Sequence, residues 1–318
     1  MATTERVRCN FCNTDESTVI YSEGELKLVK CASCGFNYVN PRIKTEELIK
    51  HYDESHSVGN EIARRSLKQA PPEQEVVTDS SWWSQKQWKI LDRWLLNDLR
   101  RIMKYKKGGR LLDVGCGDGK RLQVAFDNGW KDVYGLEVSD AAVDKLKKKF
   151  NFPDNDKHFK NASILTSGFP DNFFDVVTYW SVLEHVVDPV GLMSQAHRLL
   201  NPGGMVMIQV PNARSLATMV QEVFPQQVFR HMSPIEHIMV FTESSLNVAL
   251  DRTGFEPFAY WYHGLDFYEL VTNLVLANAN VQDSRLYGAL MENLNELQQV
   301  IDNRELSDRI IVCARKKH

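Results

Sequence analysis

The sequence lacks three features that would direct a protein to a membrane, a secretory route or a nucleic acid. No apolar run among its 318 residues approaches the length of a membrane-spanning helix, and the first ten residues are polar and charged rather than signal-like. Lysine and arginine (38) are outnumbered by aspartate and glutamate (41), and the net charge of −3 gives no general attraction to phosphate backbones. We therefore expect a cytoplasmic protein with neither a membrane nor a nucleic-acid partner.

Cysteine is scarce, but four of the six cysteines form two C-x-x-C pairs whose separation lies in the range of a zinc ribbon. Two disulfides or four free thiols are the alternatives, and a cytosolic setting argues against disulfides. Four thiolates complete the coordination shell of zinc and leave no place for a substrate, so we predict a structural ion. The predicted ligands are Cys9, Cys12, Cys31 and Cys34, with a hairpin of strands 18–21 and 26–30 between the pairs.

The rest of the chain is organised around a short apolar stretch that is followed by alternating glycines. Residues 110–114 are expected to form a buried strand, and residues 120–128 an amphipathic helix. Gly115, Gly117 and Gly119 lie between them and permit positive φ and a close approach of a ligand to the backbone. Free N–H groups at the helix start add donors and the positive end of a dipole. The pattern predicts a nucleotide-binding turn.

The spacing of these glycines argues against a dinucleotide. A dinucleotide turn has the pattern G-x-G-x-x-G, whereas here the third glycine comes one residue early. Asp113 also precedes the first glycine by two residues, and its carboxylate would repel a pyrophosphate but can pair with the amino group of a methionine moiety. The pattern D-V-G-C-G-D-G resembles motif I of the class I S-adenosylmethionine (SAM) methyltransferases.

Two later blocks extend this resemblance over residues 110–255. The sequence FFDVVTYWSVLEHVVDP at 173–189, together with LLNPGG at 199–204, resembles the ubiquinone-type and sugar-modifying small-molecule methyltransferases. Alternating strands and helices predict a doubly wound, Rossmann-like α/β sheet. The resemblance implies seven strands, with an antiparallel last strand between the fifth and sixth. The later strands are expected at 133–136, 157–160, 173–180, 205–210, 255–262 and 308–315.

Three regions are expected along the chain. Residues 1–44 form the small zinc ribbon, residues 45–105 a linker and N-terminal helices that serve as a lid, and residues 106–318 the methyltransferase domain. Within the lid, Trp82 and Trp83 either cover the cofactor or simply pack. Residues 213–241 are expected as an irregular segment over the carboxyl edge of the sheet. A helical insertion near 264–306 is expected to build a substrate wall or a homodimer contact.

The resemblance also implies a set of cofactor residues. Glu137 follows the second strand, where an acid can accept bonds from both ribose hydroxyls in dinucleotide and SAM folds alike. Ser163 stands where many family members carry Asp beside the adenine, and Ile164 is expected to pack on the ring. The implied SAM site comprises Asp113, Gly115, Cys116, Gly117, Gly119, Glu137, Val138, Ser163, Ile164, Trp180 and Ser181.

Three histidines are candidates for direct chemistry: His237, His231 and His185. A nearly neutral imidazole suits removal of a hydroxyl proton as the methyl group arrives, although each histidine can instead cap a helix or hold a loop. We expect methyl transfer to a hydroxyl of a small molecule, such as a sugar or another biosynthetic intermediate. An amine or carbon acceptor, an RNA or protein substrate read by the ribbon, and SAM binding without catalysis remain the alternatives.

Overall fold

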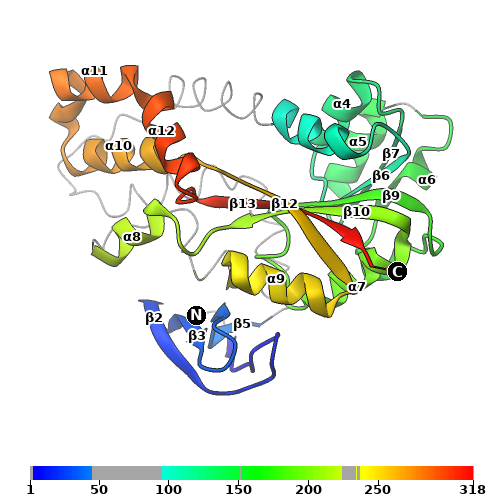
Figure 1. Cartoon of the computed structure of the whole chain (residues 1–318), viewed down its shortest axis with the longest axis horizontal. Helices are drawn as coiled ribbons and strands as arrows, with labels where there is room; N and C mark the ends of the chain where they lie inside the picture. The colour runs from blue at the N-terminus through cyan, green and yellow to red at the C-terminus, as the bar shows by residue number, and fades with distance from the viewer. Residues whose placement is uncertain (1–2, 45–94, 151, 224–233, 235–236, 318) are drawn as a thin grey trace.

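The computed structural model describes residues 3–44, 95–150, 152–223, 234 and 237–317. The strands of its largest sheet are β6 (Arg110–Val114), β7 (Asp132–Glu137), β8 (Phe159–Asn161), β9 (Phe174–Trp180), β10 (Leu200–Pro211), β12 (Phe255–His263) and β13 (Arg309–Lys316). Their order is β12-β13-β10-β9-β6-β7-β8 (Figure 1). β6 to β10 run parallel, and β13 is antiparallel to both of its neighbours. The predicted seven-stranded sheet with an antiparallel last strand is confirmed.

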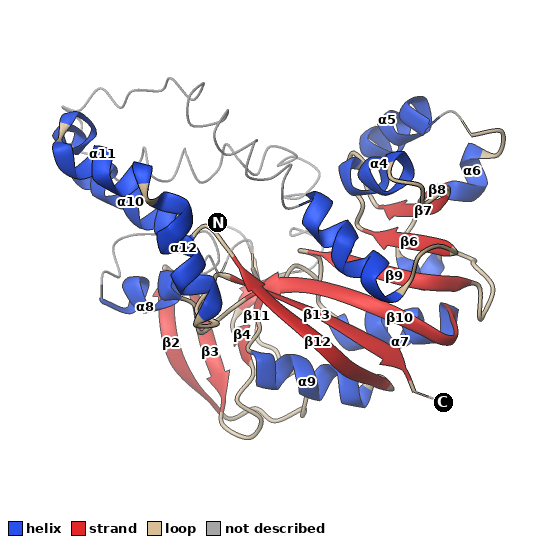
Figure 2. Cartoon of the chain, turned by 45° about the horizontal axis from the view of Figure 1, so that its top comes forward, coloured by secondary structure: helices blue, strands red, loops and turns tan. Residues whose placement is uncertain are grey.

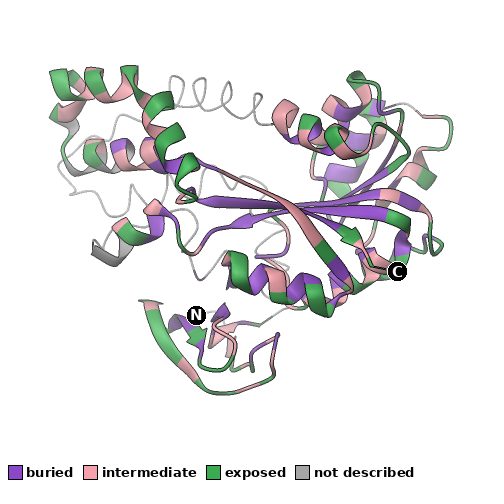
Figure 3. Cartoon of the chain, in the orientation of Figure 1, coloured by how far each residue is buried: buried purple, intermediate pink, exposed green. Residues whose placement is uncertain are grey.

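Helices cover both faces of this sheet, as Figure 2 shows. One face carries α4 (Lys120–Asp127), α5 (Asp140–Phe150) and a helix over residues 95–105, and the other carries α7 (Pro189–Leu199) and α9 (Glu243–Arg252). Alternate residues of β10 enter the two cores, since Met205 and Met207 lie in one and Val206 and Ile208 in the other. The strands β6, β9, β10 and β13 are accordingly mostly buried, whereas most of the edge strand β12 is half-buried (Figure 3).

The strand predicted at 157–160 is displaced along the chain. Residues 155–158 form one helical turn, α6 (Asn155–His158), and the strand begins only at Phe159. The side chain of Asn155 accepts from the amide of Phe152 and donates to the carbonyl of Lys147. This Asn-centred turn chemistry favours a helical turn over an extended start.

The predicted hairpin of the N-terminal region is present as β2 (Ser17–Glu23) and β3 (Leu26–Cys31). Its sheet also contains β4 (Asn37–Val39) and β11 (Met239–Val240), in the order β11-β4-β3-β2. Segment 213–241, expected to be irregular, thus supplies a strand, and it also contains α8 (Leu216–Val223). A short pair, β1 (Thr4–Glu5) and β5 (Arg42–Ile43), is formed by the ends of this region.

Helices fill the segment between β12 and β13. They are α10 (Asp266–Ala277), η2 (Ala279–Asp283), α11 (Arg285–Glu292) and α12 (Leu294–Asn303). The buried carboxylate of Asp266 accepts from the backbone amides of Ala217 (3.1 Å) and Asp308 (2.8 Å), which ties α10 to α8 and to the start of β13. Among the described residues, no helix combines the length and the apolar character that crossing a membrane requires.

Candidate functional site

The glycine turn after β6 leaves open space at its middle position. Gly115, Gly117 and Gly119 all have positive φ, of 69°, 54° and 72°. A Cβ at Gly115 would lie 2.7 Å from Val182 Cγ2, and a Cβ at Gly119 would lie 2.2 Å from Leu146 Cδ2. A Cβ at Gly117 would meet nothing within 4 Å. Packing therefore requires the outer glycines, while the middle one borders the space that a ligand can enter.

Glu137 is held at the rim of this turn by backbone amides. One carboxylate oxygen accepts from Gly117 N (2.9 Å), and the other accepts from Val138 N (2.7 Å) and Ser139 N (3.2 Å). Glu137 is the last residue of β7. It lies where an acid that binds ribose hydroxyls is expected.

Asp113 lies beneath the turn and is almost completely buried. It accepts a hydrogen bond from Thr178 Oγ1 at 2.7 Å. Burial raises the pKa of Asp113 to about 7, against the opposing effects of the Thr178 bond and of the Arg121 charge. A cationic group placed beside this carboxyl would favour its ionised form.

A pocket lies beside the turn, on the face covered by α4 and the 95–105 helix. Within it, Arg121 pairs with the buried Asp98 at 2.5 Å and lies 4.1 Å above the Trp180 ring. Asp98 and Arg121 could not be identified from the sequence, because they belong to no motif and meet only when the two helices pack. The pocket is lined by Leu95, Asp98, Leu99, Ile102, Leu111, Asp113, Arg121, Leu122, Ala125, Thr178 and Trp180.

Ser181 follows Trp180 and has a positive φ of 55°, a backbone conformation that residues other than glycine seldom adopt. Two hydrogen bonds with Gln209, each 3.1 Å long, hold it there. The strained position starts the loop at the carboxyl end of β9, where open α/β sheets bind their ligands.

The remaining predicted cofactor residues differ in accessibility. Cys116 is buried, and Val138 is 63% exposed. Ser163 caps the turn η1 (Ile164–Thr166). The side chain of Ile164 is fully buried in the core and is not available to an adenine ring, whereas the neighbouring Leu165 is 51% exposed.

The structure brings two of the three predicted histidines together. The rings of His185 and His237 lie 4.8 Å apart, edge to face, and His185 Nε2 lies 3.9 Å from Glu184 Oε1. One side-chain atom from each of these three residues lies within 4.8 Å of the others. His231 lies outside the described residues. His263 is elsewhere, buried 3.6 Å from Asp98, and burial lowers its pKa to about 3.

The histidine cluster, defined as Glu184, His185 and His237, has two chemical capacities. Glu184 is completely buried, which raises its pKa to about 8 although the charge of Arg309 opposes the shift. A carboxyl with this raised pKa can take and hold a proton near neutral pH, and an imidazole is the side chain that most often serves as a general base. Two imidazoles and a carboxylate are also a donor set for a divalent metal.

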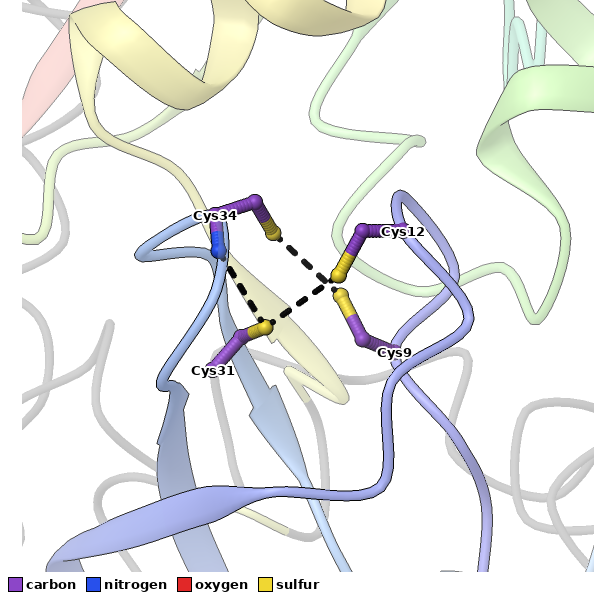
Figure 4. Close-up of side chains that lie close together, drawn as sticks. All are labelled: Cys9, Cys12, Cys31 and Cys34. Atoms are coloured by element: carbon purple, nitrogen blue, oxygen red, sulfur yellow. Dashed lines mark hydrogen bonds between the residues drawn. The ribbon is translucent and has the colours of Figure 1, made fainter.

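The four paired cysteines converge in the N-terminal region (Figure 4). Their Sγ atoms all lie within 4.8 Å of one another, with 3.5 Å between Cys9 and Cys34 and 3.4 Å between Cys12 and Cys31. Tetrahedral zinc–thiolate bonds of about 2.3 Å place the sulfurs roughly 3.8 Å apart. Each C-x-x-C turn is followed by a left-handed residue, Asn13 or Gly35. The four thiols fit a zinc ion.

The fold and the glycine turn together are those of the class I SAM-dependent methyltransferases. Residues 88–259, more than half of the chain, match the family described as "Methyltransferase domain", and the chain belongs to this family.

Curated relatives match about a third of the chain. This chain is 36% identical over 115 residues to an uncharacterized methyltransferase of Schizosaccharomyces pombe, and the match covers 33% of this chain and 41% of that protein. It is 34% identical over 107 residues to a ubiquinone biosynthesis O-methyltransferase of Pseudomonas aeruginosa, covering 33% and 45%. The chain spans less than half the length of these relatives. Among solved structures, the [4+2]-cyclase SpnF aligns with a TM-score of 0.51 and 18% identity over 87% of this chain and 98% of that chain, a likeness of fold alone.

Proposed function

We propose that this protein transfers the methyl group of SAM to a hydroxyl oxygen of a small molecule, such as a sugar or another biosynthetic intermediate. The observation that carries the proposal is the histidine cluster, which joins Glu184 and His185 of the loop after β9 to His237 just before β11. Val182 of that loop is the residue that a Cβ at Gly115 would strike, so the loop lies directly against the SAM-binding turn. An imidazole there can take the hydroxyl proton.

In this proposal the residues of the glycine turn and its rim hold SAM. Asp113 receives the amino group of the methionine moiety, Glu137 the ribose hydroxyls, and Trp180 closes the pocket. The proposal is supported by the open space over Gly117 and by the position of Glu137 at the end of β7. Cys116, Val138, Ser163 and Ser181 complete the proposed site, with Ile164 contributing to its core.

Bound SAM supplies an electrophilic methyl group on a positively charged sulfur. The protein's task is to align the acceptor oxygen with that carbon, and His237 takes the acceptor proton on its imidazole. Glu184 then faces a positive charge, which favours its ionised form and offsets the cost of burying an imidazolium.

We propose the same organisation of the chain as the sequence analysis predicts. Residues 1–44 form the metal-binding ribbon and residues 106–318 the methyltransferase domain; of the predicted linker and lid at 45–105, residues 45–94, with Trp82 and Trp83, lie outside the described residues. The helical segment between β12 and β13 then contributes a substrate wall or a dimer contact. Small molecules, rather than nucleic acid or membranes, are the proposed partners.

The test of the acceptor class uses SAM that carries a labelled methyl group. The protein is incubated with the small-molecule fraction and, separately, with the RNA and protein fractions of a cell extract. We expect label in the small-molecule fraction, as an O-methyl group by its NMR chemical shift. Label in RNA or protein, or in an N- or C-methyl group, would contradict the proposed acceptor.

We also propose that Cys9, Cys12, Cys31 and Cys34 hold one structural zinc ion. Protein purified without added metal is then expected to contain one zinc per chain by elemental analysis, and Cys31→Ser is expected to lose it. Cys313→Ser, a buried cysteine on β13, is the matched control and keeps the zinc. A folded, reduced wild-type sample with almost no zinc would refute the prediction. If the wild type contains a second zinc per chain and His237→Ala loses it, a metal also binds at the histidine cluster.

A further inference from the structure

The N-terminal ribbon is hydrogen-bonded to the backbone that carries His237. β11 pairs with β4 through Met239–Tyr38 and Val240–Asn37. Val39 N donates to the carbonyl of Ile238, the residue next to His237, at 2.9 Å. On its other side, Met239 N donates to the carbonyl of Glu184 at 3.2 Å. Segment 237–240 therefore lies between the ribbon and the residue that supplies the carboxyl of the histidine cluster.

The ribbon also reaches the segment that carries His185. Asn10, within the first C-x-x-C pair, donates from Nδ2 to the carbonyl of Val187 at 2.5 Å. Val187 lies two residues beyond His185 and packs against the core that contains Cys9. Both histidine-bearing segments are thus bonded to parts of the ribbon next to the four thiols.

Aromatic side chains beside the cysteines also pack against the segment that carries His237. Phe11 lies between Cys9 and Cys12, and Phe36 follows Cys34 by two residues. Their rings are 4.1 Å apart and lie 6.4 Å and 5.4 Å from the ring of Phe241. Phe241 ends the segment that starts at His237. Each cysteine turn therefore contacts this segment through its own phenylalanine.

A unit of this size depends on its metal for a fixed structure. Residues 3–44 are too few to build a large core of their own, and small domains of this kind are commonly held by a structural ion. A metal that joins the two cysteine turns fixes Phe11 and Phe36, and through β3 it fixes β4. Loss of the metal would release β4 as the partner of β11.

We infer that the ribbon is a positioning element for the transfer reaction: it holds His237 against His185 and Glu184, so that turnover requires the intact ribbon and SAM binding does not. This inference rests on the proposed role of His237. The contacts of the SAM-binding turn run to Glu137, Leu146 and Val182, whereas those of the ribbon run to residues 184–187 and 237–241.

The test is a double-mutant cycle of Cys31→Ser and His237→Ala, measured as label transfer from SAM to the small-molecule extract. We expect Cys31→Ser to lower the transfer rate by about 10²–10⁴-fold, the typical value of general-base help. The double variant is expected to be no slower than His237→Ala, because both changes remove the same contribution. Ile20→Ser, on an exposed position of β2 in the same ribbon, is the matched control and keeps the wild-type rate.

Two acceptor-free measurements accompany the cycle. By calorimetry, the Kd of S-adenosylhomocysteine is expected to stay within about twofold in Cys31→Ser, since Glu137 and the glycine turn are held by hydrogen bonds other than those of the ribbon. By hydrogen exchange, amides of 184–188 and 237–242 are expected to exchange faster, while those of 110–119 do not change. Asn10→Ala, which keeps all four thiols, is expected to show a smaller loss of rate in the same direction.

The outcomes separate the inference from the proposed function. If His237→Ala keeps the wild-type rate, the proposed role of His237 fails. If His237→Ala is slow while Cys31→Ser is fully active, or the two losses multiply in the double variant, the positioning role of the ribbon is overturned. A loss of S-adenosylhomocysteine binding in Cys31→Ser, with faster exchange at 110–119, would also overturn it.

Discussion

Replacement of His237 by alanine is expected to lower the rate of methyl transfer by about 10²–10⁴-fold, the usual contribution of a general base. The side chain is buried to 8% exposure, and its ring is 4.8 Å from that of His185. The variant keeps the glycine turn, so its Kd for S-adenosylhomocysteine is expected to match that of the wild type. The measurement pairs transfer rates with calorimetry and a thermal melt.

The pH dependence gives this prediction a second readout. A general base works in its deprotonated form, so the wild-type rate is expected to rise with pH. His237→Ala is expected to lose this rise together with the rate. An unchanged rate and an unchanged pH profile would mean that alignment alone drives the transfer, or that another base acts.

His263→Ala is the matched control for a structural histidine. His263 is buried beside Asp98 and is not a member of the histidine cluster, and its depressed pKa marks an imidazole that stays neutral in the fold. Its loss is expected to lower the melting temperature rather than to remove the pH dependence of the rate. The loss of transfer rate in His185→Ala is expected to lie between the losses in His237→Ala and His263→Ala, since the ring of His185 contacts that of His237.

Replacement of Gly117 by valine is expected to abolish SAM binding. A Cβ at this position meets no protein atom within 4 Å, so the isopropyl group would occupy the space over the turn without striking the fold. The positive φ of 54° adds a strain of about 1–2 kcal/mol, which a domain of this size is expected to survive. Calorimetry with SAM and with NADH measures the effect, and the wild type is expected to bind SAM only.

Gly203→Val separates loss of the ligand space from backbone strain. Gly203 has a φ of 70° and also has no atom within 4 Å of a Cβ, but it lies near the start of β10, at the edge of the sheet opposite the glycine turn. It is expected to lose a similar amount of stability and to bind SAM normally. Retained SAM binding in Gly117→Val, or preferential NADH binding by the wild type, would refute the proposed cofactor site.

Several features of this protein follow from local sequence alone. The run from Arg110 to Gly119 determines a strand, a left-handed turn and a helix start, because apolar periodicity and glycine act over a few residues. The C-x-x-C spacing likewise predicts the convergence of the four thiols, since the short hairpin of β2 and β3 between the two pairs brings the two turns together. The position of the last strand, antiparallel between the fifth and sixth, came from a resemblance over a long segment, and the pairing of β13 with β10 and β12 confirms it.

Tertiary structure alone decided how these parts meet. His185 and His237 are far apart in sequence, and their contact depends on β11, a two-residue strand that local pattern does not reveal. Asp98 and Arg121 meet because two helices pack on one face of the sheet, and Ile164 is buried because η1 lies against α7. Periodicity predicts which segments form strands and helices. Which side chains come within bonding distance depends on packing between segments that are remote in sequence, and that packing joins the ribbon to the histidine cluster.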